Sequence, residues 1–192
     1  MPRIEDIPSI PRRVLPVIYV IDTSSNMAGQ YISQINAGLK AACAKYAEDF
    51  GSKQANMHLK IAVLSCGDRP CWMHNELLGI EKFSLKALSA SGKMNMGAAL
   101  RELNSKLSEN AFLTPDSGYF TPFIIFISDS HSEDDYILPL RNLIDNDWFM
   151  RSNKLSLLSR PTADAEMMVL LAGGDIKSVA RVDDYSLISQ IL

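Results

Sequence analysis

The chain has 192 residues, of which 47% are apolar and 21% are charged, and its formal net charge is −3. A chain of this length buries about 70% of its unfolded surface, so the composition excludes a disordered chain, a collagen and a small disulfide scaffold. The slightly acidic balance, without any run of lysine or arginine, argues against nucleic acid as a partner, because phosphate binding requires clustered positive charge.

The sequence carries no pattern typical of membrane insertion or secretion. No apolar run approaches the roughly 20 residues that span a bilayer, and the N-terminus lacks a basic segment followed by an apolar one. Three cysteines, Cys43, Cys66 and Cys71, are too few for a disulfide framework, which fits a reducing compartment. Cys66 and Cys71 flank a turn with a spacing that is only a weak zinc signal, so we expect free thiols there. We therefore predict a soluble, cytoplasmic protein with no membrane partner.

The N-terminal third predicts a tail followed by strand, loop and helix. Residues 1–13 are expected to be extended, because three prolines disfavour helix in this segment: Pro2, Pro8 and Pro11. A single domain is predicted over residues 14–192. Residues 17–21 are all β-branched or aromatic, which is typical of a strand buried on both faces. Residues 30–50 place apolar side chains at every third or fourth position, which predicts one helix ending near Gly51.

The middle of the chain predicts a hairpin and a second helix. Residues 58–64 are expected to form a strand, and the Gly-Asp-Arg-Pro turn after it leads into an antiparallel strand at residues 71–73. Residues 96–107 carry an apolar helical stripe and follow a polar loop at residues 89–95.

The last third begins with the most apolar run of the chain, residues 123–127, which predicts a central strand followed by an acidic loop. The pattern then predicts a helix at 136–148 with Pro139 in its first turn, strands at 167–171 and 179–182, and a final helix at 185–192. Residues 149–166 show no clear periodicity. Strands that alternate with helices predict an α/β fold of three layers, Rossmann-like, with a mostly parallel six-stranded sheet, one antiparallel edge strand and helices on both faces.

Polar side chains at the carboxyl ends of two strands form the candidate site. Asp22 follows the first strand and Asp129 follows the strand at 123–127, and ligands of open α/β sheets bind at this edge. Ser24 and Asn26 lie two and four residues beyond Asp22, so one tight loop can direct three oxygen atoms to one point. Such hard oxygen ligands suit Mg²⁺ or Mn²⁺.

These residues lie in motifs that resemble von Willebrand factor A domains. The segment I-Y-V-I-D-T-S-S-N-M at 18–27 resembles the first strand of that family and its metal-ion-dependent adhesion motif, D-x-S-x-S. The segment A-S-G-K-M-N-M-G-A-A-L at 90–100 resembles the loop and helix G-T-x-x-G-x-A-L, and I-S-D-S at 127–130 resembles T-D-G. The match runs from about Leu15 to the C-terminus, and the lead-in R-R-V-L-P-V is most similar to the cytoplasmic branch associated with tellurium resistance.

The resemblance implies a non-enzymatic protein-interaction module. It implies that loops after Asp22, around Met94 and after Asp129 contact a protein partner, which offers an acidic residue to the bound metal. The branch further implies a role in a bacterial tellurium or stress-response complex. Beyond the metal-site positions, the residues expected to contact the partner are Ser25, Met94, Asn95, Ser130 and His131.

Three departures from the family motif predict a degenerate site. Asn26 replaces the second serine, Met94 replaces the threonine ligand, and Ser130 replaces the glycine after Asp129. A thioether is a poor ligand for a hard cation, so we expect metal binding that is weakened or absent.

Each candidate also has a plainer interpretation. Ser24, Ser25 and Asn26 could cap the following helix, and His131 could be a surface histidine. The acidic residues Asp129, Glu133, Asp134 and Asp135 could form a solvated loop at a helix N-terminus.

Enzyme motifs are missing from the sequence. It has no phosphate-binding loop of the P-loop type and no G-x-S-x-G, and Asp22 lacks the second aspartate that phosphatases of the haloacid dehalogenase type carry two residues on. We therefore predict a protein that is not an enzyme. Two alternatives stay open: a Mg²⁺-dependent phosphoester hydrolase that uses Asp22 and Asp129, and a structural subunit whose crevice has no function.

Overall fold

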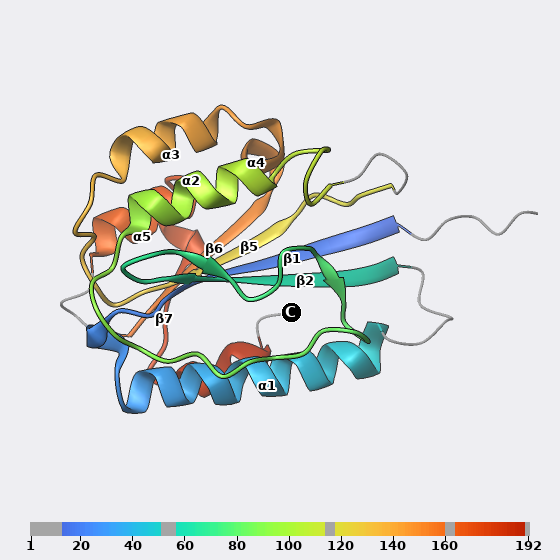
Figure 1. Ribbon diagram of the computed structural model, residues 1–192, viewed down its shortest axis with the longest axis horizontal. Helices are drawn as coiled ribbons and strands as arrows, with labels where there is room; N and C mark the ends of the chain where they lie inside the picture. The colour runs from blue at the N-terminus through green and yellow to red at the C-terminus, as the bar shows by residue number, and fades with distance from the viewer. Residues whose placement is uncertain (1–12, 51–56, 114–117, 160–163, 191–192) are drawn as a thin grey trace, which may run out of the picture.

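The structure, a computed structural model, describes residues 13–50, 57–113, 118–159 and 164–190. One mixed sheet organises it, with the strand order β3-β2-β1-β5-β6-β7 (Figure 1). The parallel strands are β1 (Arg13–Asp22), β2 (Met57–Cys66), β5 (Phe123–Ile127), β6 (Asn153–Leu158) and β7 (Val179–Arg181). Two short segments, β3 (Cys71–Trp72) and β4 (Leu78–Gly79), pair antiparallel with β2. The predicted tail lies outside the described residues except for Arg13, which begins β1.

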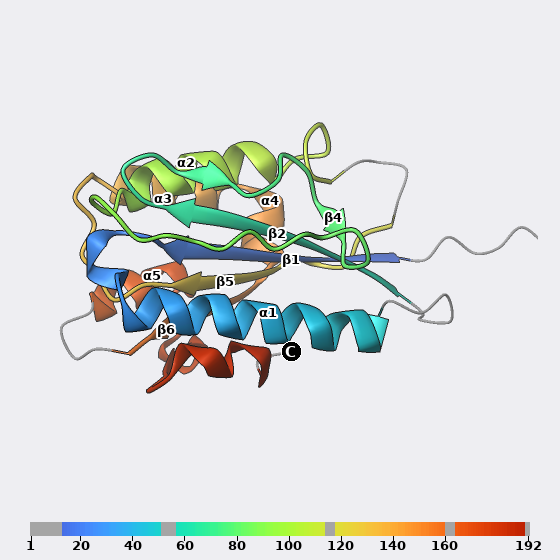
Figure 2. The ribbon, with the colours of Figure 1, turned by 60° about the horizontal axis from the view of Figure 1, so that its bottom comes forward.

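Helices cover both faces of the sheet, which confirms the three-layer α/β fold predicted from the sequence. One face carries α1 (Gln30–Phe50) and the C-terminal 3₁₀ helix η4 (Tyr185–Gln190), as Figure 2 shows beneath the strands. The other face carries α2 (Met96–Lys106), α3 (Ile137–Ile144), α4 (Asp147–Arg151) and α5 (Ala165–Leu171). Alternation along β1 supplies both cores, since Ile18 and Val20 pack on one side and Val17, Tyr19 and Ile21 on the other.

Residues 167–171 were expected to form a strand, and this prediction is wrong. They lie in α5, whose first turn is capped by Asp164, because its Oδ1 accepts a hydrogen bond of 2.9 Å from the Met167 backbone N–H. A short apolar run fits a buried helix and a buried strand equally well, so local periodicity could not distinguish them. The missed strand is β6, in the segment without clear periodicity.

The helix predicted at 136–148 is two helices. Asn146 separates them: its side chain accepts hydrogen bonds from the backbone N–H groups of Trp148 and Phe149 and so starts α4. Pro139 lies in the first turn of α3, as predicted. The expected final helix is the 3₁₀ helix η4, and the short strand near residue 180 is β7.

A pair of tyrosines joins β1 to α1 in the core between the sheet and α1. The hydroxyl oxygens of Tyr19 and Tyr46 lie 2.9 Å apart, and neither side chain is exposed. Burial raises the pKa of both phenols, that of Tyr46 to about 12. Each hydroxyl is thus the hydrogen-bond partner of the other among mostly apolar side chains.

The tyrosine pair predicts that a variant lacking both hydroxyls is more stable than a variant lacking only one. Tyr46→Phe leaves the Tyr19 hydroxyl buried without a partner and should lower the free energy of unfolding by about 1–3 kcal/mol, whereas Tyr19→Phe with Tyr46→Phe should cost less. Urea unfolding at neutral pH measures both. An equal or greater loss of stability in the double variant would contradict the pairing.

The raised pKa of Tyr46 leads to a separate prediction for the wild type. The folded protein keeps the Tyr46 proton that the unfolded chain loses, so the stability of the wild type should fall as pH rises from about 10 to 12.

Candidate functional site

Two parallel neighbours, β1 and β5, bring the two aspartates to one edge of the sheet, as the sequence predicts. Asp22 is the last residue of β1 and is completely buried. Its Oδ1 accepts a hydrogen bond from the Ser24 backbone N–H at 2.8 Å, and its Oδ2 accepts one from the Ser128 hydroxyl at 2.9 Å. Both oxygens of this carboxylate are therefore occupied by donors from the protein.

Short polar contacts link five residues around Asp22, directly or through one another. We call these residues, Asp22, Ser24, Ser128, Ser130 and Met94, the serine–aspartate cluster. The Ser24 and Ser130 hydroxyl oxygens lie 3.0 Å apart, and the Ser130 backbone N–H donates to Ser128 Oγ at 3.1 Å. The Met94 sulfur lies 3.2 Å from Ser128 Oγ. All five residues are buried, so the cluster is closed by its own contacts.

The Asp129 side chain accepts hydrogen bonds from Ser159, which follows β6 and is not part of this cluster. Its Oδ1 accepts from the Ser159 backbone N–H at 2.6 Å and its Oδ2 from the Ser159 hydroxyl at 2.5 Å. On the other side of the sheet, Tyr185 is buried, and burial together with the negative charge of Asp129 raises its pKa. The two aspartates are neighbours on the sheet edge, but their oxygens are engaged by different partners.

Hydrogen bonds join three loops next to the cluster, those that contain Ser25, Asp68 and residues 92–95. The Ser25 backbone N–H donates to the Gly92 carbonyl at 2.9 Å, and the Lys93 backbone N–H donates to Asp68 Oδ1 at 2.7 Å. The Asn95 side chain donates to the Asp68 carbonyl at 3.0 Å. Gly92 has a φ of 70°, and a Cβ there would overlap the Asp68 carboxylate, so the turn requires glycine.

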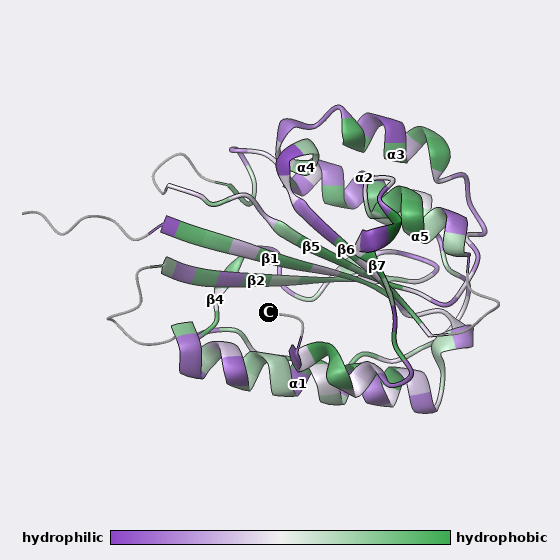
Figure 3. Cartoon of the chain, turned by 180° about the vertical axis from the view of Figure 1, so that it is seen from behind, coloured by the Kyte–Doolittle hydropathy of each residue, from purple (hydrophilic) through white to green (hydrophobic). Residues whose placement is uncertain are grey.

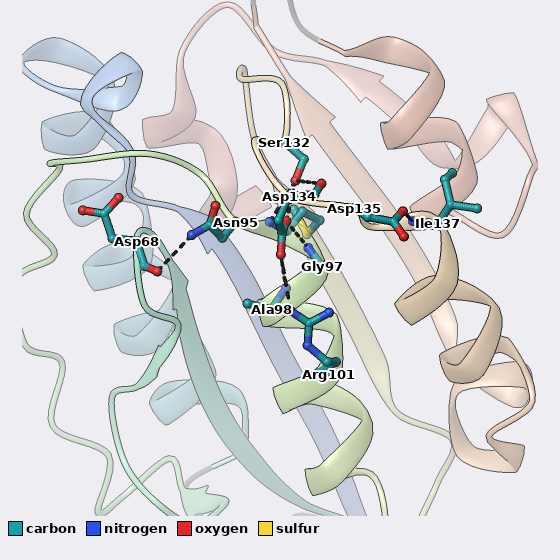
Figure 4. Close-up of polar contacts among 10 residues, drawn as sticks. Asp68, Asn95, Gly97, Ala98, Arg101, Ser132, Asp134, Asp135 and Ile137 are labelled. Carbon is teal, nitrogen blue, oxygen red and sulfur yellow. Dashed lines mark hydrogen bonds and ion pairs between the residues drawn. The ribbon is translucent and has the colours of Figure 1, made fainter.

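The acidic loop at residues 132–134 caps the N-terminus of α2, although it lies more than 30 residues away in the chain (Figure 4). Asp134 accepts hydrogen bonds of 2.8 Å from the backbone N–H groups of Gly97 and Ala98, and the Ser132 hydroxyl accepts one from Met96 at 3.1 Å. These are the N–H groups that the first turn of α2 leaves unpaired. The plainer interpretation of this loop is thus confirmed for Asp134, and Asp135 likewise accepts from the Ile137 backbone N–H at the start of α3.

The predicted site residues differ in their access to solvent. Ser25, Asn26 and His131 are exposed and Asn95 is partly buried, and we call these four residues, each within two positions of a cluster residue in the chain, the rim. Met94 and Ser130 were expected to contact a partner, but they are only 1% and 3% exposed and lie behind this surface. His131 Nδ1 lies 3.2 Å from Asp164 Oδ2.

The helix-capping alternative does not account for Ser24. Ser24 is the residue before η2 (Ser25–Met27), but its side chain makes no capping hydrogen bond there and contacts Ser130 instead. Asn26 belongs to η2 and is exposed, in contrast to the buried residues of the cluster.

The donor set suits a divalent cation only in part. Asp22 and Asp129 supply hard carboxylate oxygens, each of which accepts a protein hydrogen bond with one of its two lone pairs. The Met94 sulfur lies 3.2 Å from Ser128 Oγ within the cluster, and a thioether is a poor ligand for a hard cation. Within the described residues, no group of three or more His, Cys, Asp or Glu side chains could hold a metal ion.

Sequence reasoning missed two serines of this region. Ser128 lies in the I-S-D-S segment, so its place beside Asp22 could have been inferred from the strand pairing. Ser159 follows β6, and it was missed because the strand itself was missed. The cysteines are as predicted, since Cys43, Cys66 and Cys71 are all free thiols. Among the described residues, no helix combines the length and apolar character that crossing a membrane requires.

Solved structures with the same fold include several von Willebrand factor A proteins. A von Willebrand factor type A protein from Catenulispora acidiphila aligns with a TM-score of 0.66 at 13% identity, over 94% of this chain and 41% of that chain. Proximal thread matrix protein 1 from the mussel byssus, with a zinc-occupied MIDAS motif, aligns with a TM-score of 0.64 at 14% identity, over 95% and 47%. The pilus adhesin SpaC from Lactobacillus rhamnosus GG gives 0.65 at 9% identity, over 94% and 30%.

The chain spans less than half the length of each of these three proteins. No protein-family model and no curated protein sequence matches it. At these identities the likeness establishes the fold, and the chain has the fold of von Willebrand factor A domains.

Proposed function

We propose that this chain is a non-enzymatic protein-interaction module of the von Willebrand factor A type, which binds its partner at the carboxyl edge of the sheet. The observation that carries the proposal is that loops bearing rim residues are joined to their neighbours by hydrogen bonds. Ser25 bonds to Gly92, Lys93 and Asn95 bond to Asp68, and Asp134 bonds to the start of α2. A surface that is ordered before binding loses little conformational entropy on association. The adhesin with the same fold supports an interaction role.

Recognition at this rim is proposed to work without a metal ion. The serine–aspartate cluster satisfies its own hydrogen bonds, so its role is to support the rim from beneath. The partner then contacts the accessible residues Ser25, Asn26, Asn95 and His131, and an acidic side chain of the partner can be received by Lys93, which is 69% exposed and pairs with Glu133 at 3.5 Å.

Catalysis is not part of the proposal. The serine hydroxyls of the cluster contact Asp22, Met94 and one another, and no histidine or lysine among the described residues makes a hydrogen bond to them. A serine nucleophile requires such a base. A phosphoester hydrolase would instead show Mg²⁺-dependent turnover that Asp22→Ala abolishes, and we expect no turnover from either protein.

The motif resemblance to the tellurium-resistance branch supports placing this module in a cytoplasmic stress-response complex of a bacterium. The partner is then a protein of the same complex. This assignment rests on the sequence motifs and is tested by identifying the captured partner.

Site-specific photocrosslinking tests the rim as the binding surface. A photoreactive amino acid at Ser25 or His131 should capture the same protein from cell extract, and one at Glu48, which is exposed near the far end of α1, should not. An excess of wild-type chain should compete for capture, but an excess of the His131→Glu chain, altered at the rim, should compete less well. Equal capture from all three positions would contradict the proposal.

Metal independence has its own test. The thermal unfolding midpoint of the wild type should be the same in EDTA and in rising Mg²⁺ or Mn²⁺ at constant ionic strength. A cation at about 100 times its dissociation constant would stabilise the fold by about 2.7 kcal/mol, which this measurement would detect. A metal-induced increase in the wild type that Asp22→Ala removes would show a working metal site.

A further inference from the structure

A hollow of about 370 Å³ lies at the end of the sheet where β1 begins, away from the candidate site at the other end of this strand. It lies on the face of the sheet that carries α4, which Figure 3 shows together with α2, α3 and α5. Its volume is within the range of about 300–1,000 Å³ that is typical of ligand sites. Two aromatic and five polar side chains border it: Tyr119, Trp148, Arg13, Glu109, Thr121, Asp147 and Arg151.

The two aromatic rings of this hollow are partly accessible. Tyr119 and Trp148 meet edge to face with ring centroids 6.1 Å apart, and both pack against the core on this side of the sheet without being fully buried. The Trp148 backbone N–H bonds to Asn146, but the indole N–H makes no hydrogen bond with another described residue. The hollow therefore offers an aromatic surface with an available N–H donor.

The polar border supplies further donors. Its four charged side chains form no ion pair with one another or with other described residues. The Arg13 guanidinium lies 4.0 Å from the centroid of the Phe120 ring and donates to the Tyr119 carbonyl at 3.0 Å. Aromatic rings flanked by donors suit a polyproline II segment, because its prolines pack on aromatic side chains and its backbone carbonyls have no internal partners.

The sequence directly before Arg13 has the pattern of such a segment. Residues 8–11 read P-S-I-P, the P-x-x-P pattern of polyproline II ligands, and they follow Ile7. With three residues per turn, a polyproline II helix places Pro8 and Pro11 on one face and Ile7 and Ile10 on the next. Residues 7–11 carry no charge, so their burial takes no ionised group out of water. This segment lies outside the described residues.

The tether at Arg13 favours this segment over any other occupant. Arg13 itself borders the hollow, and five residues of polyproline II cover only about 16 Å, so residues 8–11 are within reach of it. A short tether gives an effective concentration of about a millimolar or more. Docking within one chain also avoids the loss of translational freedom that a second molecule incurs, so a small contact area is sufficient.

We propose that residues 7–11 dock into this hollow of the same chain as a polyproline II segment. Pro8 and Pro11 pack against Tyr119 and Trp148, and the Trp148 indole N–H donates to a backbone carbonyl of the segment. This intramolecular site lies at the opposite end of β1 from the serine–aspartate cluster, so it does not depend on the function proposed for the rim.

The fluorescence of Trp148 tests this proposal. In a Trp72→Phe background Trp148 is the only tryptophan of the chain, and docking should shield its ring. Pro8→Ala with Pro11→Ala in the full chain should shift its emission to longer wavelength and increase its quenching by acrylamide. Glu5→Gln is the matched control, because it changes the same part of the chain outside the docked residues, and it should alter neither property. Circular dichroism checks that each variant is folded.

Three further measurements identify the occupant. Nuclear Overhauser contacts should join the Trp148 ring to the rings of Pro8 and Pro11. The shielding of Trp148 should not change when the protein is diluted. A peptide with the sequence of residues 1–12 should restore shielding to the double-alanine variant at about millimolar concentration, whereas the same peptide with both prolines replaced by alanine should not.

Two results would overturn the proposal. Equal emission and quenching of Trp148 in the full chain with and without Pro8 and Pro11, together with no contacts between these rings, would show that the segment does not occupy the hollow and would leave it to a partner protein. Shielding that is lost on dilution would assign the site to the segment of a second copy.

Discussion

Met94→Thr is expected to raise the affinity of this chain for a divalent cation above that of the wild type. The change removes the sulfur atom 3.2 Å from Ser128 Oγ and introduces a hydroxyl beside Asp22 and the cluster serines. Hard oxygen atoms then replace a soft thioether at the centre of the site. In Mn²⁺ at about 100 times its dissociation constant, the variant should be about 2.7 kcal/mol more stable than in EDTA, as measured by thermal unfolding.

The comparison must allow for the lost packing of Met94, which is 1% exposed. In EDTA, Met94→Thr should be about 2 kcal/mol less stable than the wild type, because a buried apolar side chain is shortened. Met94→Leu is the matched control, since it preserves apolar volume without supplying an oxygen, and it should not respond to Mn²⁺. Adding Asp22→Asn to Met94→Thr should remove the response. A variant insensitive to Mn²⁺ would show that the hydrogen bonds on the carboxylates, and not the sulfur alone, exclude the ion.

Gly97→Ala is expected to destabilise the protein, although the same change in an exposed helix position usually stabilises it by about 1 kcal/mol. A Cβ on Gly97 would overlap the Asp135 carbonyl and press on the Asp134 carboxylate. The acidic loop must then move away and release the hydrogen bonds to the Gly97 and Ala98 backbone N–H groups. We expect a loss of about 2–4 kcal/mol in urea unfolding at neutral pH.

Hydrogen exchange locates this effect. The amides of Gly97 and Ala98 should lose protection in Gly97→Ala, because they lose their Asp134 acceptor. Glu102→Ala, an exposed change in the same helix, should alter neither stability nor exchange by a comparable amount. Unchanged protection at the start of α2 would mean that the loop accommodates the methyl group, and the rim would then be less rigid than the structure indicates.

Local pattern alone was enough for the elements with the clearest periodicity. The helical stripe at 30–50 matches α1 at both ends, because it repeats the helical period over its whole length. The run at 123–127 matches β5 at both ends, because all five of its residues are β-branched or aromatic, unlike those at 167–171. The same reasoning placed Asp22 and Asp129 at one sheet edge, because the carboxyl ends of parallel strands share that edge.

Tertiary contacts decided what the local pattern left ambiguous. The five apolar residues at 167–171 became a helix because Asp164 caps it and the sheet accepts one side of it, while the polar-apolar mixture of β6 became a strand because β5 and β7 supply its hydrogen bonds. Periodicity over so few residues carries no information about neighbours that lie far away in the chain.

The sequence by itself determined the fold class and that Asp22 and Asp129 meet at one edge of the sheet. Only the tertiary structure decided what those residues do there: Asp129 bonds to Ser159, Asp22 to Ser128, and Met94 lies buried among serines. The physical reason is that a hydrogen bond forms only within a narrow range of donor–acceptor distances. The partner of each side chain therefore depends on the precise relative position of segments that are 30 to 106 residues apart in the chain. Motif spacing specifies the strand ends, and packing then determines whether their oxygens face an ion or one another.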